Sequence, residues 1–322
     1  MNDYLTGYGI NFLVLGLGDG TSHAVEQLAK QISNNQESAP TTNTDFAIAH
    51  TDIHQLKRFD VPHKLQLGSK RGLGQNPIEV VRQFTEQSES EIRTLLDGYD
   101  VVFLVVGLGD DIGTGSAPIV ARIAKEMGSC HVVSVVTTPF VFEGIKRQQV
   151  AQDGLITLSK EADCVINIDN NKLKEMYDNS SFEELLQHSN DAVCHTVLNI
   201  ISIFVTTNVI GIDFGDVCRT LTGSGRIGLG RANGEGRATK ATQNATTSPL
   251  LNGNSLDSTQ SLLVSIKTAN LTIEELQEVA NVMGSIIDLE NSNIFYGVAT
   301  DDDLGDDLIV TIVATRPFDD TP

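Results

Sequence analysis

The stretch Gly107–Gly115 holds residue types that can bind a charged ligand. Four of its nine residues are glycine. It follows the apolar, β-branched run Val101–Val106, and a pattern typical of a helix covers Ile119–Met127. Glycines allow a backbone to approach an anion closely, and the N-terminus of a helix directs N–H groups toward it. A strand, a glycine-rich turn and a helix in this order predict a phosphate site, although many such turns bind nothing.

A second glycine-rich turn lies near the N-terminus. The apolar run Ile10–Leu15 ends at the segment Gly16–Gly20, which reads Gly-Leu-Gly-Asp-Gly, and apolar residues at helical spacing follow over Ala24–Ile32. This pattern predicts a βα unit whose turn is either a plain connection or part of a nucleotide site. An NAD-type enzyme is disfavoured, because Gly16–Thr21 breaks the dinucleotide fingerprint.

The composition is typical of a globular protein that binds neither nucleic acid nor membranes. The chain has 322 residues, enough for two domains, and a net charge of -20 from 42 acidic and 22 basic residues. This charge repels nucleic acid and anionic membranes. No apolar run approaches the roughly 20 residues of a membrane helix, and Met1–Gly9 lacks the features of a signal peptide. The four cysteines are widely spaced, as expected of reduced thiols, so we expect a cytoplasmic protein.

Several motifs resemble those of the tubulin/FtsZ family and occur in the same order along the chain. The segment 107–118 is similar to the FtsZ phosphate loop G-G-G-T-G-T-G-A-A-P, and 135–147 is similar to V-V-T-K-P-F-x-F-E-G-x-K-R. His50–Asp52, Asp169–Leu173 and Asp213–Asp216 resemble N-T-D, P-N-D-K-L and the end of N-x-D-F-x-D. The resemblance extends from about Asn11 to about Thr315.

The segment pattern and the resemblance both predict an α/β fold. Apolar strands alternating with helices favour a parallel, doubly wound N-terminal sheet, whose ligands bind at the carboxyl ends of the strands. The resemblance implies a nucleotide-binding, GTPase-type domain at 1–178, a central helix and connection at 179–212, and an α+β C-terminal domain at 213–322. The local patterns further predict one helix over Val80–Leu96 and a loop leading into a helix over Gly223–Lys240. They predict a helix over Leu271–Leu289, with Thr272 as N-cap and Glu275 at capping-box spacing. The run Asp301–Asp307 predicts a solvated turn rather than a calcium loop.

The resemblance implies a site for GTP or GDP, with magnesium, in the N-terminal domain. Glu143 would accept hydrogen bonds from the ribose and Arg147 would contact the nucleotide, unless the two only form an i,i+4 pair on a helix. Leu186 stands where FtsZ has a phenylalanine that stacks on guanine. The residues that the resemblance assigns to the nucleotide are Gly18, Gly20, Gly109, Gly113, Thr114, Gly115, Glu143, Arg147, Asn170, Asn190 and Asp191, of which the last three would read the base.

Hydrolysis in this family is completed by acidic residues from the next subunit of a filament. Asp213 and Asp216 match these acids, and Gly211 replaces the asparagine of the motif. The resemblance therefore implies that both aspartates are catalytic and polarise the attacking water across a head-to-tail contact. The alternative is that they only cap the next helix.

The phosphate loop departs from the family pattern where a ligand's charge would lie. Asp110, Asp111 and Ile112 stand where FtsZ has Gly, Gly and Thr, and Asp19 adds a carboxylate to the first loop. Two unit charges about 4 Å apart repel by about 4 kcal/mol at an effective dielectric near 20. That is half of the roughly 8 kcal/mol that binds a micromolar ligand. We also expect Asp and Ile to resist the positive φ angles that glycines adopt.

These departures predict a filament-forming protein of GTP-binding type with impaired or slow GTP hydrolysis. The loop Gly72–Pro77 is also shorter than its FtsZ counterpart. Magnesium or calcium that bridges the carboxylates to phosphate would rescue the site, and His50 is either a further ligand or, as is commoner for a lone histidine, a plain polar residue. The alternative is a nucleotide-free pseudo-GTPase that assembles, or regulates a true FtsZ, without catalysis.

The expected partner is a second copy of this chain, in a head-to-tail polymer, or another FtsZ-like protein. FtsZ normally continues into a linker and an adaptor-binding tail, and this sequence ends at Pro322. We therefore expect no docking to membrane adaptors through a C-terminal peptide, and the net charge of -20 predicts no direct membrane binding and no nucleic-acid contact.

Overall fold

Strands and helices alternate along the first part of the chain, as the apolar pattern predicts. The computed structural model describes residues 9–34, 43–68, 77–205, 214–251, 256, 259–287 and 292–318. The chain divides into two units, Met1–Val197 and Leu198–Pro322, and the division falls inside one long helix. The domain ranges expected from the sequence place that helix between the two domains, and they stay a prediction.

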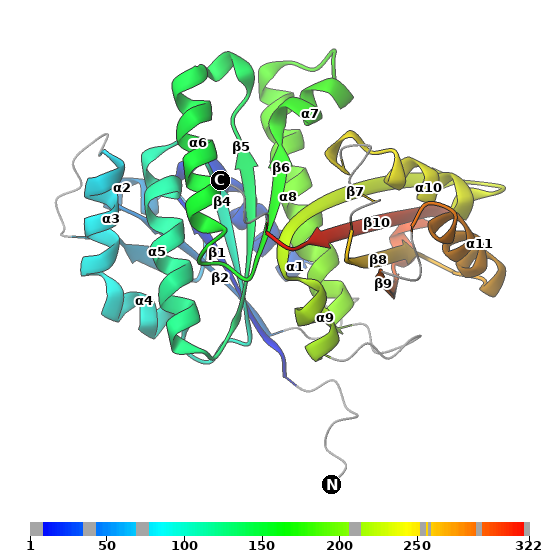
Figure 1. Ribbon diagram of the computed structural model, residues 1–322, viewed down its shortest axis with the longest axis horizontal. Coiled ribbons are helices and arrows are strands. Elements are labelled where there is room, and N and C mark those ends of the chain that lie inside the picture. The colour runs from blue at the N-terminus through cyan, green and yellow to red at the C-terminus, as the bar shows by residue number, and fades with distance from the viewer. Residues whose placement is uncertain are drawn as a thin grey trace, which may run out of the picture. The chain divides into compact units, whose positions relative to one another are not determined.

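The first unit is built on a parallel sheet. Its strands lie in the order β3-β2-β1-β4-β5-β6, and every neighbouring pair is parallel. The order reverses between β1 and β4, so the loops after these two strands lie side by side at the carboxyl edge (Figure 1). The strands are β1 (Asn11–Leu17), β2 (Asn43–His50), β3 (His63–Gln66), β4 (Val101–Gly107), β5 (His131–Thr138) and β6 (Cys164–Asp169).

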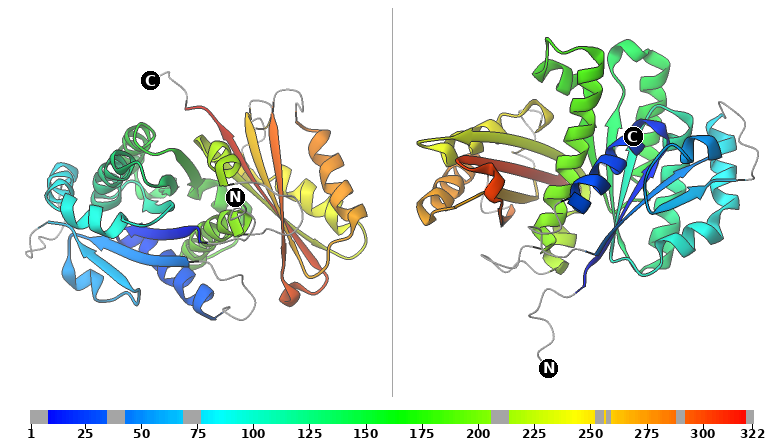
Figure 2. Two further views of the ribbon diagram at one scale, coloured as in Figure 1. Left: turned by 90° about the horizontal axis from the view of Figure 1, so that it is seen from below. Right: turned by 180° about the vertical axis from the view of Figure 1, so that it is seen from behind.

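Helices cover both faces of this sheet, which confirms the predicted doubly wound fold. Helices α3, α5 and α6 lie on one face, and α1 lies on the other beside the first part of α8 (Figures 1 and 2). The Cys194 thiol in α8 donates to the Ala24 carbonyl in α1 at 3.4 Å. The helices are α1 (Asp19–Asn34), α2 (Ile53–Leu56), α3 (Ile78–Gln87), α4 (Glu89–Leu96), α5 (Asp111–Met127), α6 (Ile145–Leu158), α7 (Asn170–Met176) and α8 (Phe182–Val205), with a 3-10 turn at Val141–Glu143.

The single helix predicted over Val80–Leu96 is wrong, because Ser88 interrupts it. The backbone of Ser88 has φ -96° and ψ 16°, and α3 ends there as α4 begins. The Ser88 hydroxyl accepts from the Gly68 N–H at 2.8 Å and donates to the Phe84 carbonyl at 3.0 Å. The break is therefore stabilised by a contact with a segment distant in sequence, which a local helical pattern does not reveal.

The second unit is an α+β structure around a four-stranded sheet. Strand β10 pairs antiparallel with β7 and β8, and β8 pairs parallel with β9. Alternate residues of β10 point to opposite faces: Val310 and Ile312 join the core under α10 and α11, whereas the Thr311 hydroxyl accepts from the Asn199 amide of α8 at 2.8 Å. The elements are α9 (Phe214–Thr220), β7 (Gly223–Asn233), α10 (Arg237–Thr246), β8 (Ser261–Thr268), α11 (Ile273–Gly284), β9 (Asn293–Thr300) and β10 (Asp307–Arg316), with 3-10 turns at Pro249–Leu251 and Asp302–Leu304.

Strand β7 replaces the loop that the sequence predicts at the start of Gly223–Lys240. A Cβ at Gly228 would lie 2.3 Å from the Ala245 carbonyl oxygen, and one at Gly230 would lie 2.0 Å from that of Ala241. These glycines therefore let the backbone of α10 pack directly on the strand. Elsewhere in this unit, Thr272 and Glu275 form the predicted capping box at the start of α11, which ends at Gly284 rather than at Leu289.

The buried guanidinium of Arg237 joins three segments of the second unit. It pairs with Glu275 at 2.6 Å, and it donates to the Asn270 carbonyl at 2.7 Å and the Asp306 carbonyl at 3.0 Å. Glu275 is thus held both by Arg237 and by the cap of α11. The Asp301–Asp307 run forms the expected exposed turn between β9 and β10, and its residue Asp306 also takes part in this network.

Replacing Arg237 with alanine should lower the free energy of unfolding by about 3 kcal/mol, because it leaves the partly buried Glu275 carboxylate and the Asn270 and Asp306 carbonyls without their partner. The change is measurable by urea denaturation. Arg231→Ala is the matched control, since its pair with Asp307 is exposed and should contribute far less. Equal losses in the two variants would contradict this account.

Candidate functional site

The loops that follow β1 and β4 contact each other at the carboxyl edge of the first sheet. Gly18 has φ +86°, and its N–H donates to the Ala49 carbonyl at 3.3 Å. A Cβ at Gly18 would lie 3.3 Å from both the Asp110 Oδ2 atom and the Gly113 nitrogen. Glycine at position 18 therefore lets the first loop lie directly against the start of α5.

Close packing also explains the glycines of the second loop. Gly109 has φ +98°, and its N–H donates to the Thr114 hydroxyl at 2.9 Å. A Cβ at Gly113 would lie 2.4 Å from the Gly107 carbonyl oxygen, and one at Gly115 would lie 3.0 Å from the Ile78 carbonyl oxygen of α3. These glycines place the N-terminus of α5 against the end of β4, where an anion could be bound.

Gly20 differs from the other candidate glycines. It lies exposed in the first turn of α1, and a Cβ there would meet no described atom within 4 Å. Packing therefore does not require glycine at this position. An open backbone beside the two loops is what close approach of a ligand would need.

Asp110 is the N-cap of α5. Its Oδ1 atom accepts from the Gly113 N–H at 2.6 Å. Its backbone has φ -100° and ψ 167°, an extended conformation, so the expected backbone conflict at this position is wrong. Burial raises the pKa of Asp110 to about 6, against the opposing effects of the Gly113 N–H and Arg147, and the charges of Asp19 and Asp111 raise it further.

Asp19 pairs with His50 at the end of β2. The His50 Nε2 atom lies 3.2 Å from the Asp19 Oδ1 atom, and the His50 Nδ1 atom accepts from the Asp52 N–H at 2.8 Å. This contact lowers the pKa of Asp19, which keeps the first loop negatively charged. Within the described ranges, no group of three or more His, Cys, Asp and Glu side chains could hold a metal ion.

Glu143 and Arg147 are paired on the first turns after β5. The Arg147 Nη1 atom lies 2.7 Å from the Glu143 Oε2 atom, and the Glu143 Oε1 atom accepts from the Phe140 N–H at 2.8 Å. Arg147 also donates through Nε to the Gly109 carbonyl at 3.4 Å. The i,i+4 pair is therefore present, and it lies directly beside the second loop.

The candidate base-reading residues lie in α7 and α8. Asn170 is buried, and its Oδ1 atom accepts from the Ser189 hydroxyl at 2.8 Å. The Asp191 Oδ1 atom accepts from the amides of Gln27 and Gln187, each at 2.8 Å. Asn190 is half-buried in the same helix, and Leu186 is 42% exposed. These contacts hold the Asn170 and Asp191 side chains against neighbouring groups of the protein.

Sequence reasoning missed the partners of these residues. Gln27, Gln187 and Ser189 carry no motif signal, since they are ordinary polar residues on helices. Asn171 had a signal, because it lies inside the segment that resembles P-N-D-K-L. Its Oδ1 atom accepts from the Val141 N–H at 2.7 Å, so it anchors the segment that carries Glu143.

Exposed apolar side chains gather beside Glu143. The ring centroids of Phe142 and Phe182 lie 5.8 Å apart, and these side chains are 56% and 54% exposed. Phe142 also stacks on the buried Phe140 at 4.9 Å. Val141 and Ile145 are exposed as well, and we call these four exposed residues (Val141, Phe142, Ile145 and Phe182) the aromatic face. A patch of this kind is typical of a surface that a partner covers.

The candidate catalytic aspartates belong to the second unit. Asp216 lies in the first turn of α9 and pairs with Arg219. Asp213 lies outside the described residues, as do Gly211 and positions 72–76 of the Gly72–Pro77 loop. The catalytic assignment of both aspartates stays a prediction.

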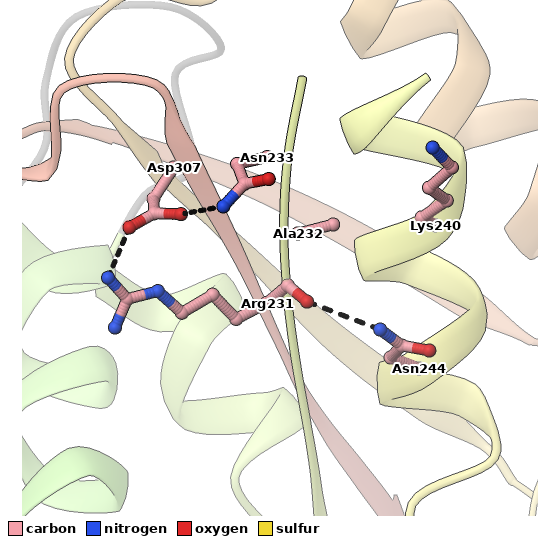
Figure 3. A pocket seen from close by; sticks show the side chains of 6 residues that line it. All are labelled: Arg231, Ala232, Asn233, Lys240, Asn244 and Asp307. Carbon is pink, nitrogen blue, oxygen red and sulfur yellow. Dashed lines mark hydrogen bonds and ion pairs between the residues drawn. The ribbon is translucent and has the colours of Figure 1, made fainter. Parts of the chain in front are cut away.

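An open hollow in the second unit is a poor candidate for a ligand site. Arg231 and Asn233 both contact the Asp307 carboxylate, and the Asn244 amide donates to the Arg231 carbonyl at 3.2 Å (Figure 3). The Lys240 ammonium donates to the Glu235 carbonyl at 2.8 Å. These charged side chains thus interact with groups of the protein itself.

Known proteins match almost the whole chain. The family model described as Tubulin/FtsZ family, GTPase domain, matches residues 11–178, and that of FtsZ family, C-terminal domain, matches residues 223–316. The cell division protein FtsZ of Mycoplasmopsis pulmonis is 36% identical over 310 residues, covering 95% of this chain and 77% of the relative. The chain belongs to the tubulin/FtsZ family. The FtsZ of Buchnera aphidicola subsp. Schizaphis graminum is 34% identical over 310 residues, covering 94% and 78%.

Solved structures of the family have the same fold. An empty FtsZ dimer from M. jannaschii matches with a TM-score of 0.87 and 29% identity, covering 98% of this chain and 90% of that one. A GTPγS-bound CetZ2 protofilament from Haloferax volcanii matches with a TM-score of 0.79 and 19% identity, covering 95% and 92%, which shows the fold alone. Family membership thus confirms the predicted α/β architecture.

None of the described helices is both long and apolar enough to cross a membrane.

Proposed function

We propose that this chain is a cytoskeletal cell-division protein of the cytoplasm that binds GTP or GDP weakly and hydrolyses GTP slowly. The observation that carries the proposal is the contact of two glycine-rich loops at the switch point of the sheet, where Gly18 lies against the start of α5. Such a place binds nucleotides in doubly wound folds. The relatives that match nearly the whole chain are named cell division proteins, which supports the cellular role.

The residues present fit a guanine nucleotide at the ribose and base end. Glu143 and Arg147 lie beside the second loop, and Asn170 and Asp191 are held in place by neighbouring side chains. Leu186 is exposed and can pack on a base, although without ring stacking. Bound GTP would supply the phosphates to be cleaved, with magnesium to neutralise their charge.

The phosphate end fits less well, because carboxylates surround it. Asp110 and Asp111 flank the start of α5, and the paired Asp19 contributes charge from the first loop. Each adds repulsion toward a polyanion, of about 4 kcal/mol at 4 Å and an effective dielectric near 20. We therefore propose slow turnover, with assembly that responds more to divalent cations than to GTP.

The test is a titration of the protein with GTP and GDP, with and without 5–10-fold excess of magnesium over nucleotide, followed by a turnover assay. Weak binding that magnesium strengthens supports the proposal. Brisk hydrolysis with micromolar binding would contradict the slow turnover. No binding under any condition would contradict the nucleotide site and would support a pseudo-GTPase that assembles or regulates an FtsZ without nucleotide.

Head-to-tail assembly follows from the same site. A subunit that completes the nucleotide site of its neighbour makes a contact between two different surfaces, and such contacts repeat into filaments. A solved relative is described as an FtsZ dimer, which supports self-association or co-assembly with another FtsZ-like protein. The aromatic face lies beside Glu143 and would be covered by the neighbour.

Replacing Phe142 and Phe182 together with alanine should raise the concentration needed for self-association about tenfold or more, because buried aromatic anchors dominate interfaces. Sedimentation velocity measures this concentration. Ile156→Ala is the matched control, since Ile156 is also exposed, at 43%, but lies on α6 outside the aromatic face. Unchanged assembly in the double variant would exclude this face from the contact.

Replacing Asp213 and Asp216 together with alanine should reduce any GTP turnover at least about 100-fold if they polarise the attacking water. The control is Arg219→Ala, which removes the ion pair of Asp216 and keeps the acid. If the aspartates only cap α9, the double variant should lose thermal stability and keep its turnover. Unchanged assembly and unchanged hydrolysis would count against the catalytic role.

A further inference from the structure

The Asp110 carboxylate binds a backbone N–H group at the start of α5. Its Oδ1 atom accepts from the Gly113 N–H at 2.6 Å. In a glycine-rich loop that binds phosphate, N–H groups of this kind are the donors to the anion. In this chain the donor is already bound to a carboxylate of the protein itself.

The second oxygen of Asp110 lies between the two loops. A Cβ at Gly18 would be only 3.3 Å from Oδ2, so the carboxylate fills the space between Gly18 and Gly113. Residue 110 is partly buried, and its extended backbone is unstrained. The Asp110 side chain therefore lies within the candidate site, between the first loop and the start of α5.

Charged groups on three helices act on Asp110. Asp19 faces it from α1, with His50 behind that residue, and Asp111 adjoins it on α5. Arg147 of α6 is the nearby cation, and its charge is shared with Glu143. The surroundings are therefore negative on balance, so a carboxylate at this position does not have a strong cationic partner of its own.

We infer that Asp110 is an internal competitor for phosphate, and that a nucleotide binds tightly only when this carboxylate is protonated. The inference rests on the proposed nucleotide site. A protonated Asp110 has lost its repulsion toward phosphate, and its hydroxyl can donate a hydrogen bond to an anion. An ionised Asp110 instead keeps the Gly113 N–H and repels the ligand.

Protonation is accessible near neutral pH, because burial raises the pKa of Asp110 to about 6. Above this pH, binding that requires the proton should weaken about tenfold for each pH unit. Below it, affinity should level off. The affinity of this protein for GTP and GDP is thus set by pH through one side chain.

The experiment compares GTP and GDP affinity of the unmodified protein and of Asp110→Asn between pH 5.5 and 8.5 by calorimetry. Asparagine is a good N-cap, so α5 keeps its first turn. The nucleotide's own ionisation is common to both proteins and cancels in the ratio of their affinities. We expect Asp110→Asn to bind about twofold more tightly at pH 6 and about 100-fold more tightly at pH 8.

Proton uptake provides a second measurement. In two buffers of different ionisation enthalpy at pH 7.5, the unmodified protein should take up close to one more proton per nucleotide than Asp110→Asn does. Asp111→Asn is the matched control, since it removes the neighbouring charge and leaves the hydrogen bond between the Gly113 N–H and Asp110 in place. It should retain both the pH slope and the proton uptake.

The outcomes separate this inference from the proposed function. If the unmodified protein binds nucleotide and Asp110→Asn shows the same pH slope with no difference in proton uptake, the inference is overturned and the nucleotide site stands. If neither protein binds GTP or GDP at any pH, the proposed nucleotide site fails, and the inference fails with it. A pH slope lost in Asp110→Asn and kept in Asp111→Asn supports both.

Discussion

Restoring glycine at positions 110 and 111 and threonine at 112 should tighten GTP binding by about 100-fold or more at pH 7.5. The triple variant removes two carboxylates from the start of α5, one of which is bound to the Gly113 N–H. Repulsion of about 4 kcal/mol per charge at 4 Å and an effective dielectric near 20 is an upper limit, since solvent and magnesium screen it. A gain of about 3 kcal/mol corresponds to the expected factor of about 100.

The restored loop has a cost in stability. Asp110 caps α5, and loss of an N-cap costs about 0.5–2 kcal/mol, although glycine is tolerated better than alanine at this position. Removal of the carboxylate offsets this cost at neutral pH, because burial raises the pKa of Asp110, so the variant should melt near the temperature of the unmodified protein and be stabilised further when GTP is added.

Fluorescence titration with a labelled GTP analogue and a steady-state turnover assay measure the effect. Ile112→Thr alone is the control, since it changes the shape of the loop and none of its charges. If the unmodified protein binds GTP at micromolar levels and hydrolyses it briskly, or if Ile112→Thr gains as much as the triple variant, the charge argument is wrong.

The strands could be predicted from the sequence where a local pattern decides the structure. Val101–Gly107 is a run of apolar residues that suits only a strand buried on both faces, and it forms β4 at the centre of the first sheet. The capping box of Thr272 and Glu275 is likewise local, because both hydrogen bonds close within one turn.

Features that depend on contacts between distant segments could not be predicted. The break at Ser88 depends on the Gly68 N–H, and β7 is a strand because α10 packs against Gly228 and Gly230. A propensity scale assigns such glycines to a loop, since it does not include the helix that fills the space of their missing side chains.

The candidate site was predictable in its composition but not in its geometry. The charge of Asp110 is evident from the sequence, and an aspartate before a helix is a known N-cap. Its orientation is not evident, because the same side chain could have pointed to solvent. The position of Gly18, which limits the space around the carboxylate, comes only from the structure.

Replacing Asp110 with asparagine should raise the free energy of unfolding by about 2 kcal/mol at pH 7 and change it little near pH 4. Burial raises the pKa of Asp110 from its ordinary value of 3.8 to about 6 in the folded protein. The folded state therefore binds this proton more tightly than the unfolded chain does. Stability consequently falls as the pH rises from about 4 to about 6, and stays at the lower value above that range.

The size of the effect is the balance of two terms. A shift of this size corresponds to about 3 kcal/mol at neutral pH. Residue 110 is only partly buried, so solvent screening reduces this figure to about 2 kcal/mol. Asparagine still accepts from the Gly113 N–H, so this hydrogen bond is present in both proteins and contributes little to the difference in their stabilities.

Urea denaturation of both proteins at pH 4, 5, 6, 7 and 8 measures the difference between their unfolding free energies. Asp153→Asn on α6 is the matched control for the change in net charge, because Asp153 is exposed. The difference between Asp110→Asn and the unmodified protein should grow between pH 4 and 6 and then level off, while that of Asp153→Asn stays small. A difference that is constant with pH would show that Asp110 titrates in the folded protein as it does in the unfolded chain, and that its carboxylate is solvated rather than enclosed between the two loops.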